Sequence, residues 1–180
     1  MNNLEQYINT SEDLNDVELN KELLEKFEWL TPRNLWSGKK ITDCMGENGE
    51  LGFWPNDEDH HPDYDYTYTL LNDFPIGWRF AFGWEMINEI NDVISECNLK
   101  DFYPTQIKEK YGSLRFYTSY TTETIYNIIK KYEDMSERIC VNCGKPATKI
   151  SVGWICPWCS DCAEKIHDKV VDIDEWFKKN

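Results

Sequence analysis

The chain has no long apolar run. None of its segments reaches about eighteen consecutive apolar residues, the length that a membrane-spanning helix needs. Its first residues, Met-Asn-Asn-Leu-Glu-Gln, also lack the positive and apolar segments of a secretory signal. These two absences predict a cytoplasmic protein that does not enter a membrane.

The chain also lacks the common signatures of catalysis. It has three histidines, no Gly-x-Ser-x-Gly elbow and no glycine-rich phosphate loop, so we expect a non-catalytic protein rather than an enzyme. One segment keeps an alternative open, because residues 57–65 combine five carboxylates with His60 and His61. Such donors could hold a divalent cation in a metal-dependent hydrolase. Against this, adjacent side chains of an extended segment point to opposite sides.

Basic residues are scarce. The chain holds 19 Lys and Arg against 33 Asp and Glu, which gives a net charge of −14. Residues 1–75 alone hold 17 acidic against 5 basic side chains. Because a negative field repels phosphate backbones and attracts cationic surfaces, we expect a partner protein with a basic surface and regard nucleic acid as unfavourable. The candidate partner-binding residues are Asp57, Glu58, Asp59, Asp63 and Asp65.

Seven cysteines are present, and their pattern predicts a metal site. An odd total does not suit a secreted disulfide framework. Cys140 and Cys143 form one Cys-x-x-Cys pair, and Cys159 and Cys162 form another. Two such pairs are a signature of zinc, because each tight turn directs two thiolates at one point of a tetrahedron. Gly144 suits the sharp turn after the first pair.

The ligand set has one ambiguity, because Cys156 precedes Cys159 by the same spacing. We prefer Cys162 over Cys156, since Pro-Trp makes a stiff turn and the chain after Cys162 has a helical pattern. His167 is a weaker alternative. Four thiolates leave no open position for water, so we expect a single structural Zn²⁺ rather than a catalytic one.

Apolar periodicity predicts the secondary structure. Helical spacing recurs in three central or N-terminal segments, and alternation marks strands around Gly112. We expect a helix over 17–30, a short strand through Tyr64, Tyr66 and Tyr68, a helix over 82–98, a hairpin of 106–111 and 114–118, a helix from Thr121 or Thr122, and a closing helix over 162–178.

These elements predict an α+β fold, in which a small hairpin or sheet packs with helices and a structural zinc ribbon or knuckle follows. We divide the chain into an acidic, aromatic-anchored region over 1–75, a helix-hairpin-helix core over 76–138, and a four-cysteine knuckle with a closing helix over 139–180. Cys44 and Cys97 stand apart from the knuckle, and we expect them to be small apolar side chains.

The second half of the chain resembles an uncharacterised family of small bacterial, prophage and phage proteins. The residues that carry the resemblance are Lys-Glu-Lys-Tyr-Gly-Ser-Leu-Arg-Phe-Tyr over 108–117, Cys-Val-Asn-Cys-Gly over 140–144, and Gly153-Trp154 leading to Cys159 and Cys162. The resemblance covers about residues 76–163 and supports the same four ligands; it implies no activity. A phage origin would place the protein in a bacterial host cell, where it could inhibit a host defence protein or act as an adaptor.

The predicted hairpin suggests another alternative. Lys108, Lys110 and Arg115 are expected on its outer face together with Tyr117, and a mixture of cations and aromatic rings can bind single-stranded nucleic acid. A nucleic-acid-binding or transcription-regulatory zinc-ribbon protein is therefore the second hypothesis, although the net charge opposes it.

Overall fold

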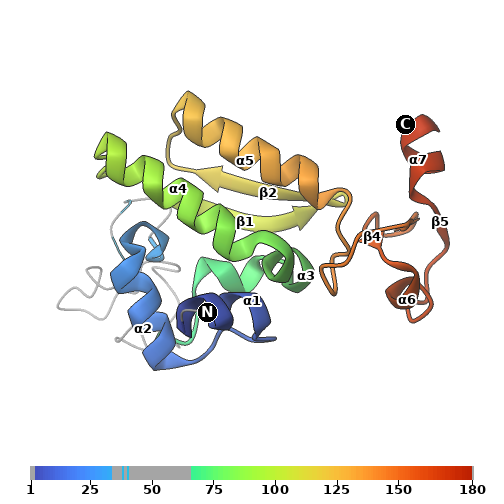
Figure 1. The fold of residues 1–180 in the computed structure, drawn as a ribbon, viewed down its shortest axis with the longest axis horizontal. Helices are drawn as coiled ribbons and strands as arrows, with labels where there is room; N and C mark the ends of the chain where they lie inside the picture. The colour runs from blue at the N-terminus through green and yellow to red at the C-terminus, as the bar shows by residue number, and fades with distance from the viewer. Residues whose placement is uncertain (1–2, 34–37, 39, 41–65, 180) are drawn as a thin grey trace, which may run out of the picture.

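The computed structural model describes residues 3–33, 38, 40 and 66–179. Helices pack around a two-stranded hairpin, and a small three-stranded sheet lies in a separate module at the C-terminal end (Figure 1). The predicted α+β class is therefore confirmed. The elements are α1 Asn3–Thr10, α2 Val17–Lys26, η1 Glu28–Leu30, η3 Leu70–Asp73, α3 Ile76–Trp78, η4 Arg79–Gly83, α4 Trp84–Cys97, β1 Pro104–Lys110, β2 Ser113–Thr118, α5 Glu123–Ser136, β3 Lys149–Ser151, β4 Pro157–Trp158, α6 Ser160–Ala163, β5 Val170–Asp172 and α7 Ile173–Lys179.

The N-terminal helices join the same core as the centre of the chain. Asp16 caps α2 by accepting a hydrogen bond from the Leu19 amide, as an N-cap aspartate does. The predicted helix over 17–30 ends early, because the chain turns at Phe27 and continues as the 3₁₀ turn η1. One buried cluster extends from Leu4 to Tyr132, so apolar side chains of α1 and α2 pack with those of 76–138.

A continuous helical path leads from α3 through the π-helical turn η4 into α4. The predicted helix over 82–98 is thus correct in its centre and begins earlier. Arg79 in η4 is almost fully buried and donates to the backbone carbonyls of Ile8 at 2.8 Å and Glu12 at 3.0 Å. Burial lowers the pKa of Arg79. Its guanidinium thus satisfies carbonyls at and beyond the end of α1.

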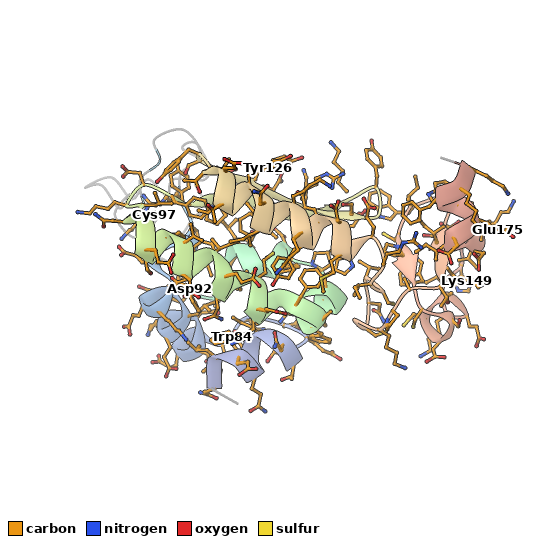
Figure 2. All side chains as sticks on the ribbon, turned by 45° about the horizontal axis from the view of Figure 1, so that its top comes forward. Trp84, Asp92, Cys97, Tyr126, Lys149 and Glu175 are labelled. Carbon is orange, nitrogen blue, oxygen red and sulfur yellow. The ribbon has the colours of Figure 1, made fainter. Side chains whose placement is uncertain are left out.

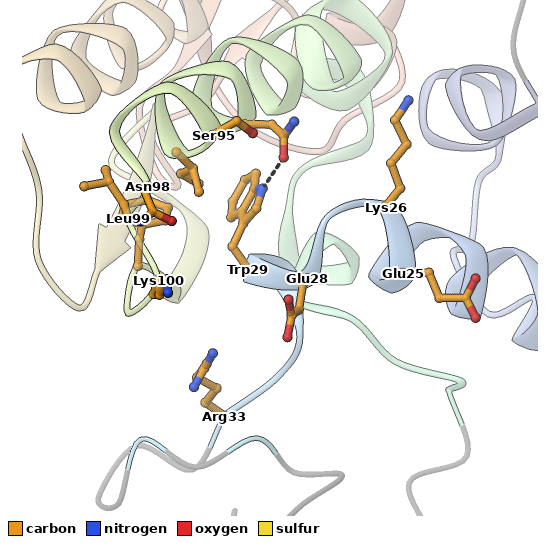
Figure 3. A pocket seen from close by; sticks show the side chains of 12 residues that line it. Glu25, Lys26, Glu28, Trp29, Arg33, Ser95, Asn98, Leu99 and Lys100 are labelled. Carbon is orange, nitrogen blue, oxygen red and sulfur yellow. Dashed lines mark hydrogen bonds between the residues drawn. The ribbon is translucent and has the colours of Figure 1, made fainter.

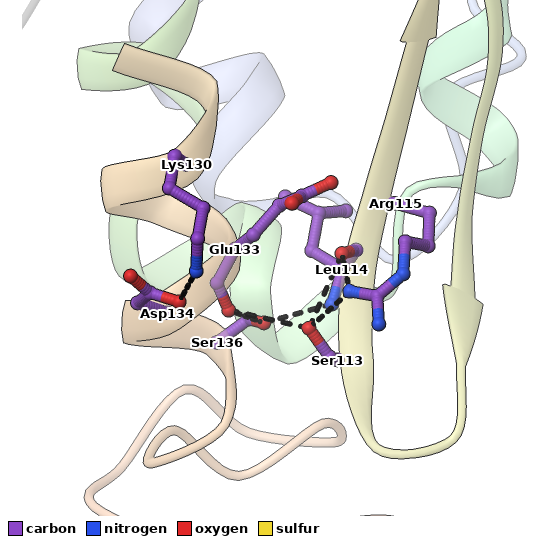
Figure 4. A network of polar contacts seen from close by, with 7 residues as sticks. All are labelled: Ser113, Leu114, Arg115, Lys130, Glu133, Asp134 and Ser136. Carbon is purple, nitrogen blue, oxygen red and sulfur yellow. Dashed lines mark hydrogen bonds and ion pairs between the residues drawn. The ribbon is translucent and has the colours of Figure 1, made fainter. Parts of the chain in front are cut away.

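The hairpin forms as predicted. Strands β1 and β2 are antiparallel, with Ile107 opposite Phe116 and Lys108 opposite Arg115. Helix α5 lies along β2, and Thr122 caps it by accepting from the Ile125 amide. The two elements are joined by the Ser136 hydroxyl, which accepts from the Leu114 amide at 2.8 Å (Figure 4). This places the end of α5, where the knuckle begins, beside the start of β2.

Residues 139–179 form the C-terminal module, which extends away from the helices at one end of the molecule (Figure 1). Its sheet has the order β4-β3-β5, with both pairs antiparallel. The predicted helix over 162–178 is wrong. Helix α6 ends at Ala163, and Val170–Asp172 pairs with β3 before α7 begins. The β-branched side chains of Val170 and Val171 favour this strand.

Two further observations complete the fold. The predicted strand through Tyr64, Tyr66 and Tyr68 is not formed in its described part, because Tyr66 has a positive φ of 60° and lies in a bend, while Tyr64 lies outside the described residues. Among the residues described, no helix has the length and apolar character needed to cross a membrane.

Candidate metal centre

The sulfur atoms of Cys140, Cys143, Cys159 and Cys162 all lie within 4.8 Å of one another. Zn–S bonds of about 2.3 Å in a tetrahedron place sulfurs about 3.8 Å apart, so the cluster has the scale of a four-thiolate site. Cys140, Cys159 and Cys162 are buried, and Trp158 packs against them. The four thiols selected from the sequence could therefore hold one metal ion.

Backbone hydrogen bonds shape the first cysteine pair. The Cys140 amide donates to the carbonyl of Lys145 at 2.8 Å, and the Gly144 amide donates to the carbonyl of Cys140 at 3.1 Å. Gly144 has a φ of +74°, the left-handed region that glycine adopts without strain. The resulting turn directs Cys140 and Cys143 to the same side, as its sequence predicts.

The second pair is set by α6. Cys159 is its N-cap residue, and Cys162 lies within its single turn. An amide of Asn142 donates to the sulfur of Cys162 at 3.4 Å, which links the second pair to the first turn. On the exposed surface, Lys145 and Asp161 form an ion pair of 2.9 Å between the two halves.

Cys156 does not join the cluster. Its backbone continues into β4, its amide donates to the hydroxyl of Ser151, and its buried thiol lies near the Glu109 carboxylate. Burial raises the pKa of Cys156 to about 12, and the charge of Glu109 acts in the same direction. His167, the weaker alternative ligand, is exposed and also outside the cluster.

Burial keeps two of the clustered thiols protonated when no metal is bound. It raises the pKa of Cys143 to about 12 and also raises the pKa of Cys162. Burial opposes ionisation of Cys159 as well, but hydrogen bonds from the Cys162 amide and from neighbouring thiols lower its pKa. Since metals bind thiolates, metal binding here must release protons.

The cysteine cluster is held against the core by a contact at Gly77 and Gly144, where the backbones are too close for a side chain. A Cβ on Gly77 in α3 would lie 2.2 Å from the Cys140 carbonyl oxygen, and one on Gly144 would lie 2.7 Å from the Gly77 carbonyl oxygen. The Gly77 amide donates to the carbonyl of Val141 at 2.9 Å, and the Trp78 indole donates to the carbonyl of Ile139 at 2.8 Å. Only the Gly77-Trp78 pair is visible as a local pattern at this contact, and it does not reveal the partner segment.

Most of the other candidate residues are not among those that the structure describes. Asp57, Glu58, Asp59, Asp63 and Asp65 fall outside the described residues, as do His60 and His61 of the hydrolase alternative and Cys44. Cys97, predicted to be a small apolar side chain on a helix face, lies on α4. It is exposed at the C-terminal end of α4 (Figure 2).

A second concave site lies between η1 and the end of α4, with a volume of about 330 Å³ (Figure 3). Two of its polar side chains, Trp29 and Glu28, have hydrogen-bond partners within the protein. The Trp29 indole donates to Asn91 at 3.2 Å, and a hydrogen bond from Lys40 lowers the pKa of Glu28. We interpret this site as a surface groove between packed elements and not as a ligand-binding site.

No protein-family model, curated protein or solved structure matches this chain significantly. The resemblance to the family of small bacterial and phage proteins therefore stays a prediction, and the function must be inferred from the residues themselves.

Proposed function

We propose that this chain is a zinc-stabilised, non-catalytic protein that binds a partner with a basic surface. The observation that carries the proposal is the cluster of four thiols within 4.8 Å. An all-thiolate set suits Zn²⁺, and four such ligands close the coordination shell against water and substrate. The metal's contribution would be to hold residues 139–179 in one conformation against α3.

The described part of the acidic region supports a cationic partner. Glu18, Glu22 and Glu25 follow one another at helical spacing along α2, and all three are exposed. Of these, Glu18 forms an ion pair with Lys21. Like charges at i and i+4 destabilise a helix by a few tenths of a kcal/mol, about the size of a favourable pair. A basic surface would remove that repulsion and gain complementary charge.

The partner-binding role of Asp57, Glu58, Asp59, Asp63 and Asp65 belongs to the same proposal. They add five carboxylates to the acidic side chains of α2 in the same N-terminal part of the chain. The resemblance to phage proteins suggests its context, in which the protein acts in the cytoplasm of a bacterial host as an inhibitor or adaptor, for example on a defence protein.

Affinity capture from a bacterial host lysate, followed by mass spectrometry, tests the binding role. We expect one basic host protein to be captured by the wild type. Replacing the five carboxylates of 57–65 by lysine should abolish its capture, and the same changes at Glu18, Glu22 and Glu25 should weaken it. The captured protein should elute with added salt, because exposed charges are screened.

A control variant, Glu164→Lys with Glu175→Lys, changes the charge of two exposed carboxylates in the C-terminal module instead. It should capture the partner as the wild type does. Equal capture by all the variants would contradict the acidic binding region.

Metal analysis tests the other half of the proposal. Purified protein should contain one zinc ion per chain, and the metal should be lost in Cys159→Ser. Protein that folds fully without metal would contradict it.

A further inference from the structure

A pocket lies where the turn of the β1–β2 hairpin meets the loop before β4. It has a volume of about 470 Å³ and is lined by residues 108–111 and 153–155. The Trp154 indole donates to one oxygen of Glu109 at 3.0 Å, and the Gly112 amide donates to the other at 2.7 Å. A single carboxylate thus ties both walls together, and the pocket has the size of a small-ligand site.

Two aromatic rings border this pocket and face solvent. Tyr111 is 74% exposed and Trp154 is 73% exposed, the largest values for aromatic side chains among the residues that the structure describes. Large rings are usually more buried than this, because exposing them gives up the hydrophobic gain. Both rings therefore expose surface to a planar ligand, and the Lys110 Nζ lies 5.7 Å from the centroid of the Tyr111 ring.

The backbone of the hairpin turn is unusual for a tyrosine. Tyr111 has a φ of 55° and Gly112 a φ of 79°, so both central residues of the turn are left-handed. A turn of this type favours asparagine or glycine at its first position, and a bulky side chain there is strained. Strained residues that local packing does not require are often found at binding sites. The strain at Tyr111 therefore points to a use for its exposed ring.

Three cations lie on the hairpin. Lys110 is the one beside the Tyr111 ring, and the Lys108 Nζ is 6.0 Å from the centroid of the Tyr117 ring. Lys108 is directly opposite Arg115 across the two strands, and Lys110 lies one pleat further toward the turn. Like charges opposite one another destabilise a hairpin. Within the described part of the chain, no carboxylate forms an ion pair with any of the three. An anionic ligand would relieve this repulsion.

We propose that this pocket binds a nucleotide, either free or at the end of a single strand. The base stacks on Trp154 or Tyr111, and the phosphate lies at Lys108 and Lys110. Stacking on aromatic side chains tolerates any base, since each base has a π face.

The net charge of −14 does not exclude so small an anion. The hairpin turn lies beside the C-terminal module, at the other end of the molecule from acidic α2 (Figure 1). At physiological ionic strength, charges are screened over about 8 Å, so nearby groups set the field in the pocket. These are Lys108 and Lys110, together with the Glu109 carboxylate that already accepts hydrogen bonds from Trp154 and Gly112. A long duplex would still be repelled. This site is independent of the proposed acidic protein-binding region.

Calorimetric titration of the full chain tests the proposal with adenosine monophosphate, adenosine, inorganic phosphate and a short oligodeoxyadenylate as probes. We expect adenosine monophosphate to bind, and both adenosine and phosphate to bind at least about tenfold more weakly. If the oligonucleotide binds more tightly than the mononucleotide, the ligand is the end of a strand. If it binds equally or more weakly, the ligand is a free nucleotide. Failure of both adenosine monophosphate and the oligonucleotide to bind at about 1 mM would overturn the proposal.

Three variants locate the site. Trp154→Ala and the double variant Lys108→Ser, Lys110→Ser should each weaken binding about tenfold, in line with the usual effect of losing a stacked ring. Tyr111→Asn should weaken binding while raising the melting temperature, because asparagine suits the turn. A purely structural role for Tyr111 predicts unchanged binding in this variant.

Tyr126→Ala and Lys178→Ser serve as matched controls, because both residues are exposed and lie outside the pocket lining. They should bind like the wild type. An acidic peptide containing tyrosine is the competing ligand class. If it binds more tightly than the nucleotides, or if Trp154→Ala binds them unchanged, the nucleotide assignment is wrong.

Discussion

The core of residues 4–132 and the C-terminal module of residues 139–179 are stabilised in different ways. The core buries a single cluster of apolar side chains drawn from helices and from the hairpin. The module has a cluster of its own that consists of cysteines, with Trp158 packed against it. A segment of this size buries too little apolar surface to fold alone, and a metal is one of the usual remedies.

This difference implies that the module needs the core in order to stay folded more than the core needs the module. On the proposed function, the module would depend on its metal and on its contact with α3, whereas the core, with its own buried cluster, would persist without the module.

Removing the metal should unfold the module and leave the core folded. Structural zinc sites contribute about 10–16 kcal/mol of apparent binding free energy, which small domains need to fold. In Cys159→Ser, or after chelation, NMR amide signals of 139–179 should collapse to unfolded positions while those of 66–136 remain dispersed. Cys156→Ser is the control and should keep its metal, because Cys156 lies outside the cluster. An unchanged spectrum after chelation would show that the module does not need metal.

Phe82→Ala should destabilise the core and leave the metal site of the module intact. Phe82 is buried, stacks on Tyr132 with ring centroids 5.2 Å apart and contacts Phe74. Truncating such a side chain lowers the free energy of unfolding by about 3–5 kcal/mol. Urea denaturation should show this loss, while the metal content at low urea stays that of the wild type. Tyr126→Ala on exposed α5 should change stability by no more than about 0.5 kcal/mol.

Gly77→Ala should damage the contact between the two regions. Its new methyl group would overlap the Cys140 carbonyl and the following peptide, so one segment has to move. Overpacking of this kind costs about 1–3 kcal/mol. We expect a lower melting temperature together with faster metal loss to a chelator. Gly153→Ala is the control and a milder change, since the atoms nearest to its Cβ belong to the side-chain carboxylate of Asp168. Metal retention like that of the wild type in Gly77→Ala would contradict the importance of the contact between Gly77 and the cysteine loop.

The smallest effect should be a pH dependence that belongs to the core. Burial raises the pKa of Tyr132 from 10.0 to about 12, and its hydroxyl donates to Glu89 at 3.0 Å. The unfolded chain therefore loses this proton first. The contribution to stability is complete below pH 10 and disappears as the pH rises toward 12. Tyr132→Phe should show a flatter decline of stability in this range, and an identical decline would assign it to other groups.

In the centre of the chain, the local sequence pattern was sufficient to predict the secondary structure. The helix over 84–97, the hairpin and the helix over 123–136 each have a strong apolar period, and their caps are visible in the sequence, as at Thr122. The four clustered cysteines follow from spacing, because a Cys-x-x-Cys turn is a local structure.

The C-terminal strand could not be predicted as easily. Its pairing joins Lys149 to Asp172 across more than twenty residues, and no local pattern reveals such a partner. One signal was present, however. Asp172 accepts hydrogen bonds from the amides of Asp174 and Glu175, and Asp-x-x-Glu is a common helix start. It marks α7 as a new helix and not the continuation of α6.

The two facing glycines limit how this architecture can be altered. Any other metal-binding loop grafted onto this scaffold needs a glycine where it faces α3, and α3 needs a glycine at the position of Gly77. Residues 77 and 144 therefore constrain each other, and a chimaera that replaces only one of them by a larger residue should dock its cysteine loop loosely against α3.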